Sequence, residues 1–133
     1  MLSTQLKSIS PLGGRYHSKV SALSDFFSEY ALIKYRVFVE LKWYEALCAE
    51  PKIQEIPTLS PITKKEIAKI LNNFSVNDAK QIKKIEIETN HDVKAVEYYL
   101  KEEAKRRAGS TGGAQLAERL EFFHFACTSE DIN

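Results

Sequence analysis

Three short stretches of the chain combine residue types that can bind anions or move protons, and the first of them is a loop. Residues 11–14, PLGG, predict a turn with unusual backbone freedom, and Arg15 and Tyr16 follow it directly. An arginine offers a planar fork of donors that suits a phosphate or a carboxylate. The pattern therefore predicts an anion-binding loop, and the competing interpretation is a surface turn with a solvated arginine.

The second stretch is Asn90-His91-Asp92, which lies inside a longer segment with helical spacing. Thr89 and Asp92 have the spacing of a helix cap and its partner, which favours a helix that begins here. The three side chains would then lie at a helix N-terminus, where free backbone N–H groups attract anions and a histidine can donate a hydrogen bond or a proton. The competing interpretation is one uninterrupted helix with His91 on its polar face.

The third stretch is FFHFACTSEDIN, residues 122–133, in which His124 precedes another start signal, Thr128-x-x-Asp131. This pattern again predicts a histidine beside hydroxyl groups, here those of Thr128 and Ser129, at a helix N-terminus. The competing interpretation is a histidine packed in the core and an ordinary helix cap. The spacing of the three histidines is unlike that of metal ligands, so the sequence predicts no metal site.

Long amphipathic helices must position these stretches. Apolar residues that recur in steps of three and four predict a first helix over residues 23–49, capped by Ser21 or Ser24 and ended by Pro51. At about 1.5 Å per residue such a helix is long for a small domain, and it favours a larger helical assembly. Its buried face is expected to carry Phe26, Tyr30, Ile33, Val37, Leu41, Tyr44 and Cys48.

Local start and stop signals predict the remaining helices. The serine–proline pair at residues 60–61 is typical of a helix start, and SVND at residues 75–78 resembles a capping box. Residues 109–113, GSTGG, predict a flexible link, and residues 114–126 predict a last helix. No stretch has the alternation of a strand, so the predicted fold class is all-α.

The composition is that of an ordinary globular chain. It has 133 residues, 44% of them hydrophobic, and 19 basic against 18 acidic residues give a formal net charge of +1. This balance argues against nucleic acid or an anionic membrane as a partner. No apolar run is long enough for a transmembrane helix, and the first residues lack the apolar core of a signal peptide. Cys48 and Cys127 are therefore expected to be buried thiols of a cytoplasmic protein.

Three separate blocks resemble the adenylosuccinate lyase family, in the form found in many bacteria. They are SPLGGRYHSKVSALSDFFSEYALIKYRVFVELKW, ETNHDVKAVEYYLKE and FFHFACTSEDIN. The resemblance implies an all-helical, homotetrameric carbon–nitrogen lyase of the fumarase/aspartase superfamily that needs no metal or organic cofactor. Such an enzyme eliminates fumarate from adenylosuccinate to give AMP, and also from the succinyl-carboxamide ribotide of purine biosynthesis.

The resemblance also implies roles for residues in the first two blocks. Arg15 and Tyr16 match the family's N-terminal substrate contacts, at the nucleotide phosphate. Asn90, His91 and Asp92 match its NHD or RHD segment. His91 is expected close to the reacting succinyl-purine, as a supporting catalytic residue that orients the substrate.

In the third block, Thr128 and Ser129 match a superfamily segment that holds a substrate carboxylate or nearby groups. His124 matches a family histidine implicated in phosphate binding. The sequence departs from the family pattern before the arginine of the first block, where Gly13-Gly14 stands in place of the frequent Asp-Gly. That loop is expected to be looser than in the family.

The family's general-acid histidine and its base, a serine on a mobile loop, are expected beyond residue 133. The resemblance thus implies an N-terminal helical domain over residues 1–112 and the start of a central helical domain over residues 113–133. It also implies an N-terminal segment that is inactive alone. Two other functions stay open, namely a related lyase acting on argininosuccinate or aspartate, and a non-catalytic helical interaction domain.

Overall fold

Helices are the regular elements of residues 3–133, the part of the chain that the computed structural model describes, and no strand occurs there. The predicted all-α fold class is therefore confirmed. The chain divides into two units, Met1–Leu32 and Ile33–Asn133. The predicted domain boundary between residues 112 and 113 stays a prediction.

The first unit consists of short helices and a tight loop. In the loop, the N–H groups of Gly13 and Gly14 both donate to the carbonyl oxygen of Ser10, each at 3.1 Å. A Cβ atom at Gly14 would lie 3.0 Å from the carbonyl oxygen of Gln5, so the close turn favours glycine there. The helices of this unit are α1 (Ser3–Leu6), α2 (His17–Val20), the 3-10 helix η1 (Ser21–Leu23) and α3 (Ser24–Phe27).

Helix α4 (Glu29–Ala49) begins later than the sequence predicted. Ser28 separates it from α3 with an extended backbone, φ −85° and ψ 164°, and the Ser28 Oγ accepts the N–H of Ala31 at 3.1 Å. The cap of α4 is therefore Ser28, and neither of the two predicted serines fills that role. Phe26 belongs to α3 and is exposed instead of buried. The end of α4 before Pro51 is confirmed.

Three further helices form the frame of the second unit, and both predicted start signals are confirmed. The Ser60 Oγ accepts the N–H of Thr63 at 3.1 Å. The Ser75 N–H donates to the Asp78 carboxylate at 2.8 Å, in a capping box. The helices are α5 (Pro61–Asn72), α6 (Val76–Thr89) and α7 (Asp92–Arg107).

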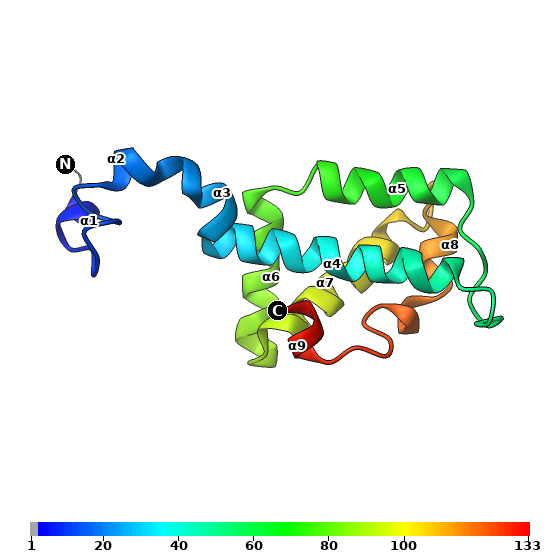
Figure 1. Cartoon of the computed structure of the whole chain (residues 1–133). Helices are drawn as coiled ribbons and strands as arrows, with labels where there is room; N and C mark the ends of the chain where they lie inside the picture. Colours follow the sequence, from blue (N-terminus) through cyan, green and yellow to red (C-terminus); the bar gives the residue numbers. More distant parts are fainter. Residues whose placement is uncertain (1–2) are drawn as a thin grey trace. The chain divides into compact units, whose positions relative to one another are not determined.

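Apolar side chains from these helices meet in one core. Figure 1 shows α4 and α5 alongside each other, and α9, at the C-terminus of the chain, beside the start of α7. The expected buried face of α4 is confirmed from Ile33 onward. The most deeply buried apolar side chains include Val37, Leu41, Tyr44, Ile67, Ile82, Val93, Val96, Leu100 and Leu116.

The predicted helix over residues 114–126 is wrong. The chain forms α8 (Ala114–Ala117), the 3-10 helix η2 (Leu120–Phe122) and then a loop that leads to α9 (Ser129–Ile132). In this loop His124 and Ala126 adopt left-handed backbone conformations, with φ of 60° and 58°. The loop allows Phe123 to stack on Tyr44 of α4, with ring centroids 4.6 Å apart. Because Tyr44 lies outside residues 114–126, the spacing of residues within that segment could not predict this contact.

The loop at residues 109–113 is exposed over its first three residues and packed over its last two, and there the prediction of a flexible link is wrong. Gly112 and Gly113 are both buried. A Cβ atom at Gly113 would lie 1.8 Å from the carbonyl oxygen of Arg107, and one at Gly112 would lie 2.7 Å from Cγ of Glu66. The glycines therefore let the chain pass close to α5 and α7, where no larger residue fits.

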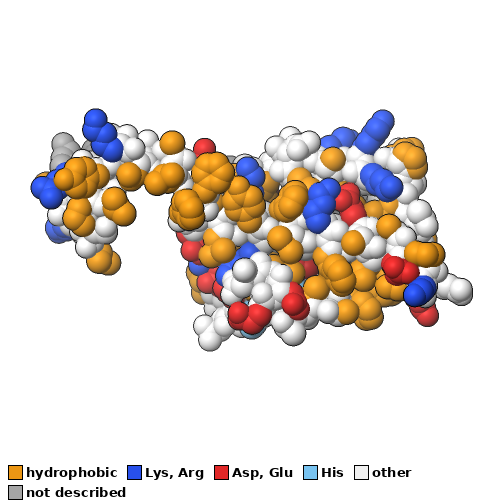
Figure 2. Space-filling view, viewed as in Figure 1, with side chains coloured by type: hydrophobic (Ala, Val, Ile, Leu, Met, Phe, Trp, Pro, Cys, Tyr) orange, Lys and Arg blue, Asp and Glu red, His pale blue; other side chains and the backbone are white. Residues whose placement is uncertain are grey.

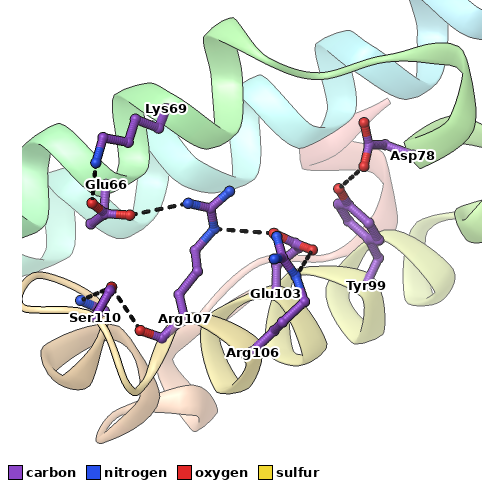
Figure 3. A network of polar contacts seen from close by, with 9 residues as sticks. Glu66, Lys69, Asp78, Tyr99, Glu103, Arg106, Arg107 and Ser110 are labelled. Carbon is purple, nitrogen blue, oxygen red and sulfur yellow. Dashed lines mark hydrogen bonds and ion pairs between the residues drawn. The ribbon is translucent and has the colours of Figure 1, made fainter.

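Ion pairs tie α5 to α7 beside this loop (Figure 3). Arg107 donates from Nη1 to Glu66 at 3.0 Å and from Nε to Glu103 at 3.1 Å. The side chains of the two glutamates are only 9% and 10% exposed, so the arginine balances carboxylates that are largely removed from water. Figure 2 shows charged side chains of both signs spread over one face of the second unit.

Candidate functional site

Asn90 and His91 form a joint between α6 and α7, so the chain is not one uninterrupted helix here. Asn90 ends α6 in the left-handed conformation, with φ 51° and ψ 34°. His91 is the N-cap of α7, in place of the predicted Thr89, and its Nδ1 accepts the N–H of Lys94 at 3.1 Å. The predicted helix start is confirmed, and its cap is an imidazole.

This cap fixes the hydrogen-bonding role of the His91 ring. A ring nitrogen that accepts a backbone N–H carries a lone pair, so in the neutral ring the proton is on Nε2. Nε2 lies 3.3 Å from the Oγ of Ser129 in α9. The side chain is 48% exposed, which leaves it accessible to a ligand. His91 is therefore arranged as a hydrogen-bond donor through Nε2.

An open hollow of about 520 Å³ lies at this joint, lined by Lys83, Glu86, Ile87, Asn90, His91 and Asp92. Two of the first N–H groups of α7 are already bonded within the chain. The N–H of Val93 donates to Asp92 Oδ1 at 2.9 Å, and that of Lys94 donates to His91. Of the backbone N–H groups that the sequence predicted to be free, these two already have partners within the chain. The polar groups that line the hollow are therefore mainly side chains.

Asp92 is anchored by Arg36, a residue of α4 that is only 5% exposed. Nη2 of Arg36 lies 2.7 Å from Oδ2 of Asp92, and the same nitrogen donates to the side-chain oxygen of Asn133. Burial acts to raise the pKa of the Asp92 carboxyl, but the Val93 N–H and the Arg36 charge lower it more, so the net shift is downward. Asp92 is thus a fixed carboxylate that joins α7 to α4.

Thr128 begins α9, as the sequence predicted. Its N–H and its hydroxyl both donate to Oδ2 of Asp131, at 2.7 and 3.1 Å. These two bonds hold the pKa of the Asp131 carboxyl below its ordinary value. The capping box sets the start of α9 so that Ser129 meets His91. The structure therefore brings together two of the predicted site residues that lie far apart in the sequence.

His124 is linked to a buried acid of α4. Its Nδ1 lies 2.6 Å from Oε1 of Glu40, whose side chain has no exposed surface. The His124 side chain is 17% exposed, so it is largely packed against α4 but keeps some access to solvent. Beside this loop, a smaller hollow of about 220 Å³ is lined by Val39, Trp43, Ala126, Cys127, Asp131 and Ile132.

Arg15 and Tyr16 belong to the first unit. The guanidinium carbon of Arg15 lies 4.9 Å from the centre of the Tyr16 ring, within the range of a cation–π contact. Both side chains are exposed. Arg15 also lines an open hollow of about 500 Å³ with residues of the preceding loop. Their role in anion binding stays a prediction.

Sequence reasoning missed Arg36 and Glu40, the two residues of α4 that hold the site segments. A signal was present, because both lie on the apolar stripe of α4, next to Val37 and Leu41. Charged residues on a buried face need a partner to balance their charge, so their position should have marked them as anchors. They are four residues apart, about one helical turn, and they reach Asp92 and His124 respectively.

The cysteine prediction is confirmed in part. Cys48 is buried, whereas Cys127 is half-buried, and burial raises the pKa of both thiols. Across residues 3–133, no group of three or more His, Cys, Asp or Glu side chains could hold a metal ion. In the same part of the chain, no helix is both long and apolar enough to cross a membrane.

Adenylosuccinate lyases are similar to the chain over nearly all of its length. The one from Legionella pneumophila (strain Corby) is 48% identical over 133 residues, 100% of this chain and 28% of that protein. The one from Escherichia coli (strain K12) is 48% identical over 130 residues, 98% of this chain and 27% of that protein. The one from Dictyostelium discoideum is 44% identical over 133 residues, 96% of this chain and 27% of that protein.

No protein-family model matches the chain. The chain spans about 28% of the length of the Legionella relative. Because the identity extends along the whole chain, the chain is homologous to the N-terminal part of adenylosuccinate lyases.

Proposed function

We propose that the chain is the N-terminal part of an active adenylosuccinate lyase. The observation that carries the proposal is the identity of 48% along the whole chain with an adenylosuccinate lyase. The reaction is a β-elimination, in which a base removes a proton from the carbon beside a carboxylate, the carbon–nitrogen bond breaks, and an acid protonates the departing nitrogen. The products are fumarate and AMP, or fumarate and the free carboxamide ribotide.

His91 supports the reaction by holding the substrate. Its Nδ1 is used by the Lys94 N–H, so Nε2–H is the group that remains for a substrate oxygen or nitrogen. The nearby Ser129 hydroxyl offers a second donor beside it. In this proposal the two side chains orient the succinyl group, and the acid and base of the elimination come from outside residues 1–133.

The proposal includes further substrate contacts, each taken from the family resemblance. In the first unit, Arg15 and Tyr16 are proposed to contact the nucleotide phosphate. In the second unit, His124 is proposed as a phosphate contact and Thr128 as a contributor to the carboxylate contacts. The assembly of the whole enzyme is a homotetramer, it acts in the cytoplasm, and it uses no organic or metal cofactor.

The proposal is tested by steady-state kinetics on the full-length protein that carries this chain. We expect turnover of adenylosuccinate by the full-length protein and none by residues 1–133 alone. His91→Ala in the full-length protein is expected to lower kcat/KM by more than about tenfold, or ~1.4 kcal/mol, because a donor to the substrate is lost. Lys84→Ala, at an exposed position of α6, is the matched control and is expected to leave kcat/KM unchanged.

Three results would contradict the proposal. They are turnover by the 133-residue chain alone, a His91→Ala effect smaller than about tenfold, and a full-length protein with no activity on adenylosuccinate. Argininosuccinate and aspartate are assayed in parallel. Turnover of either one in place of adenylosuccinate would assign the chain to a related lyase.

A further inference from the structure

Glu40 is a buried acid of the second unit to which the proposed mechanism gives no role. Its side chain is completely buried in α4, and its Oε1 lies 2.6 Å from Nδ1 of His124. Its second oxygen, Oε2, has no hydrogen-bond partner among the described residues. Burying a carboxylate is costly unless a partner balances it, and His124 is that partner. A group retained at such a cost calls for a functional explanation.

The loop that carries His124 is held in a costly conformation. His124 and Ala126 both have positive φ, which costs a residue other than glycine about 1–2 kcal/mol. The indole N–H of Trp43 donates to the carbonyl oxygen of Phe125 at 2.7 Å, between these two residues. Contacts from α4 therefore fix both the backbone and the ring of His124, so the ring has a defined orientation.

The two site histidines use the same ring nitrogen in opposite ways. Nδ1 of His91 accepts a backbone N–H, so the neutral ring of His91 carries its proton on Nε2. Nδ1 of His124 faces a carboxylate, which accepts hydrogen bonds when it is ionised. The neutral ring of His124 then carries its proton on Nδ1 and has a lone pair on Nε2.

We propose that Glu40 is a positioning residue that holds His124 in the Nδ1–H tautomer and leaves Nε2 to bind an oxyanion of the substrate. When Nε2 takes a proton from solvent, the imidazolium charge is balanced by the Glu40 carboxylate, and the new Nε2–H donates to a phosphate or carboxylate oxygen. The oxyanion part rests on the proposed function. The tautomer part concerns this chain alone.

Charged and titratable groups on three sides act on the pair. Burial raises the pKa of Glu40, His124 opposes that rise, and the carboxylate of Glu97 in α7 adds to it. Asp131 of α9 lies within electrostatic reach of His124, and Glu40 and Asp131 both raise the pKa of the Cys127 thiol. The charged groups that act on the pair from α7 and α9 are therefore carboxylates.

The tautomers are measured by nitrogen NMR on the histidine-labelled 133-residue chain, at a pH where the rings are neutral. We expect the proton of His124 on Nδ1 and that of His91 on Nε2. Glu40→Leu removes the acceptor, so His124 is expected to shift toward the Nε2–H form. Glu40→Gln retains an acceptor oxygen and is expected to preserve the Nδ1–H form. Glu102→Gln, at an exposed position of α7, is the matched control.

Folding is checked on each variant by circular dichroism, since replacement of a buried charge by an apolar residue of similar size is often tolerated. The proposal is overturned if His124 of the wild-type chain carries its proton on Nε2, or if folded Glu40→Leu leaves the tautomer unchanged. If the role of Glu40 were only structural, Glu40→Leu and Glu40→Gln would change the stability of the chain, and His124 would have the same tautomer in both variants.

The oxyanion part is tested by adding inorganic phosphate and, separately, succinate to the chain. Perturbation of His124 Nε2 by phosphate alone identifies a phosphate site, and perturbation by succinate alone identifies a carboxylate site. We expect either response to be lost in Glu40→Leu, and no response to either ion would overturn this part. In the full-length protein, Glu40→Leu is expected to lower kcat/KM by about tenfold or more. The kcat/KM of Glu40→Gln is expected to lie between that of the wild type and that of Glu40→Leu.

The two proposals fail separately. If the tautomers follow the expectation but the full-length protein has no lyase activity, the proposed function is wrong and the positioning role of Glu40 stands. If the protein is an active lyase but His124 carries its proton on Nε2, the proposed function stands and the positioning role is wrong.

Discussion

Asn90 shows how one residue serves both the backbone and the candidate site. Its left-handed conformation ends α6, and its N–H donates to the carbonyl oxygen of Glu86 at 2.8 Å. Asparagine tolerates this conformation better than most residues other than glycine. The turn of the chain at Asn90 places His91 in position to cap α7. The amide side chain also lines the hollow at the joint.

Substitutions at Asn90 separate these two roles. Asn90→Ala is expected to lower the free energy of unfolding by about 1 kcal/mol, because alanine is strained at positive φ. Asn90→Gly is expected to cost less than about 0.5 kcal/mol, because glycine adopts this conformation freely. Urea denaturation of the chain measures both values, and equal stability of the two variants would contradict the backbone argument.

In the full-length protein, both variants lack the amide. A similar loss of kcat/KM in Asn90→Gly and Asn90→Ala would assign the amide a role in substrate binding. Full activity of Asn90→Gly would limit Asn90 to its backbone role.

At the scale of elements, the site depends on how α7 is fixed at both ends. At its start, His91 caps it and Arg36 binds Asp92. At its end, Arg107 connects it to α5, and the glycines of the next loop pass close to its last turn. A shift of α7 would therefore move the candidate site. Packing at the far end of the helix is part of what positions the site.

Gly113→Ala is expected to disturb this far end. The added Cβ would lie 1.8 Å from the carbonyl oxygen of Arg107, a backbone atom that cannot move aside alone, so we expect a loss of more than about 2 kcal/mol in unfolding free energy. Gly109→Ala is the matched control in the same loop, because no atom lies within 4 Å of its added Cβ. Thermal and urea denaturation compare the two, and a Gly113→Ala chain as stable as Gly109→Ala would contradict the packing argument.

At the scale of the whole molecule, carboxylates partly removed from water link folding to pH. Hydrogen bonds from Lys69 and Arg107 lower the pKa of Glu66. Burial acts to raise the pKa of Glu103, but bonds from Arg106 and Arg107 lower it more. The pKa values of Asp78 and Asp92 are likewise lowered on balance. The folded chain therefore binds fewer protons in mildly acidic solution than the unfolded chain does.

The sign of this linkage gives a prediction. Groups with a lowered pKa contribute stability that is present above their ordinary values, 4.5 for Glu66 and 3.8 for Asp78, and is lost as pH falls through the lower values of the folded state. We expect urea denaturation to show a steady loss of unfolding free energy as pH falls below about 4.5. The raised pKa of Glu40 has the opposite effect on the pH dependence of stability. It is a single group, whereas several carboxyl groups have a lowered pKa.

Arg107→Gln tests the origin of this loss. Without the guanidinium, the pKa values of Glu66 and Glu103 are lowered less, so the stability of the variant is expected to depend less on pH in the acidic range. Lys105→Gln, at an exposed position of the same helix, is the control, because it removes a positive charge that makes no contact with Glu66 or Glu103. An equal pH dependence in Arg107→Gln and the wild type would contradict this account.

The local sequence determined much of the helical frame. The starts at Ser60, Ser75 and Thr128 and the stop before Pro51 were all predicted, because each depends on hydrogen bonds or steric contacts within a few residues. The helix start at residues 90–92 was also indicated, although the cap proved to be the histidine.

Tertiary structure decided the rest, since the partners lie far apart in the chain. The link from Ser129 to His91 and the link from His124 to Glu40 depend on how α4, α7 and α9 pack. The same packing broke the predicted helix at residues 114–126. Apolar and ionic contacts with distant segments outweigh a local helical preference that is worth only a fraction of a kilocalorie per residue, about 0–0.7 kcal/mol. The sequence thus determined which groups are available, and only the fold decided which distant partner each histidine ring meets.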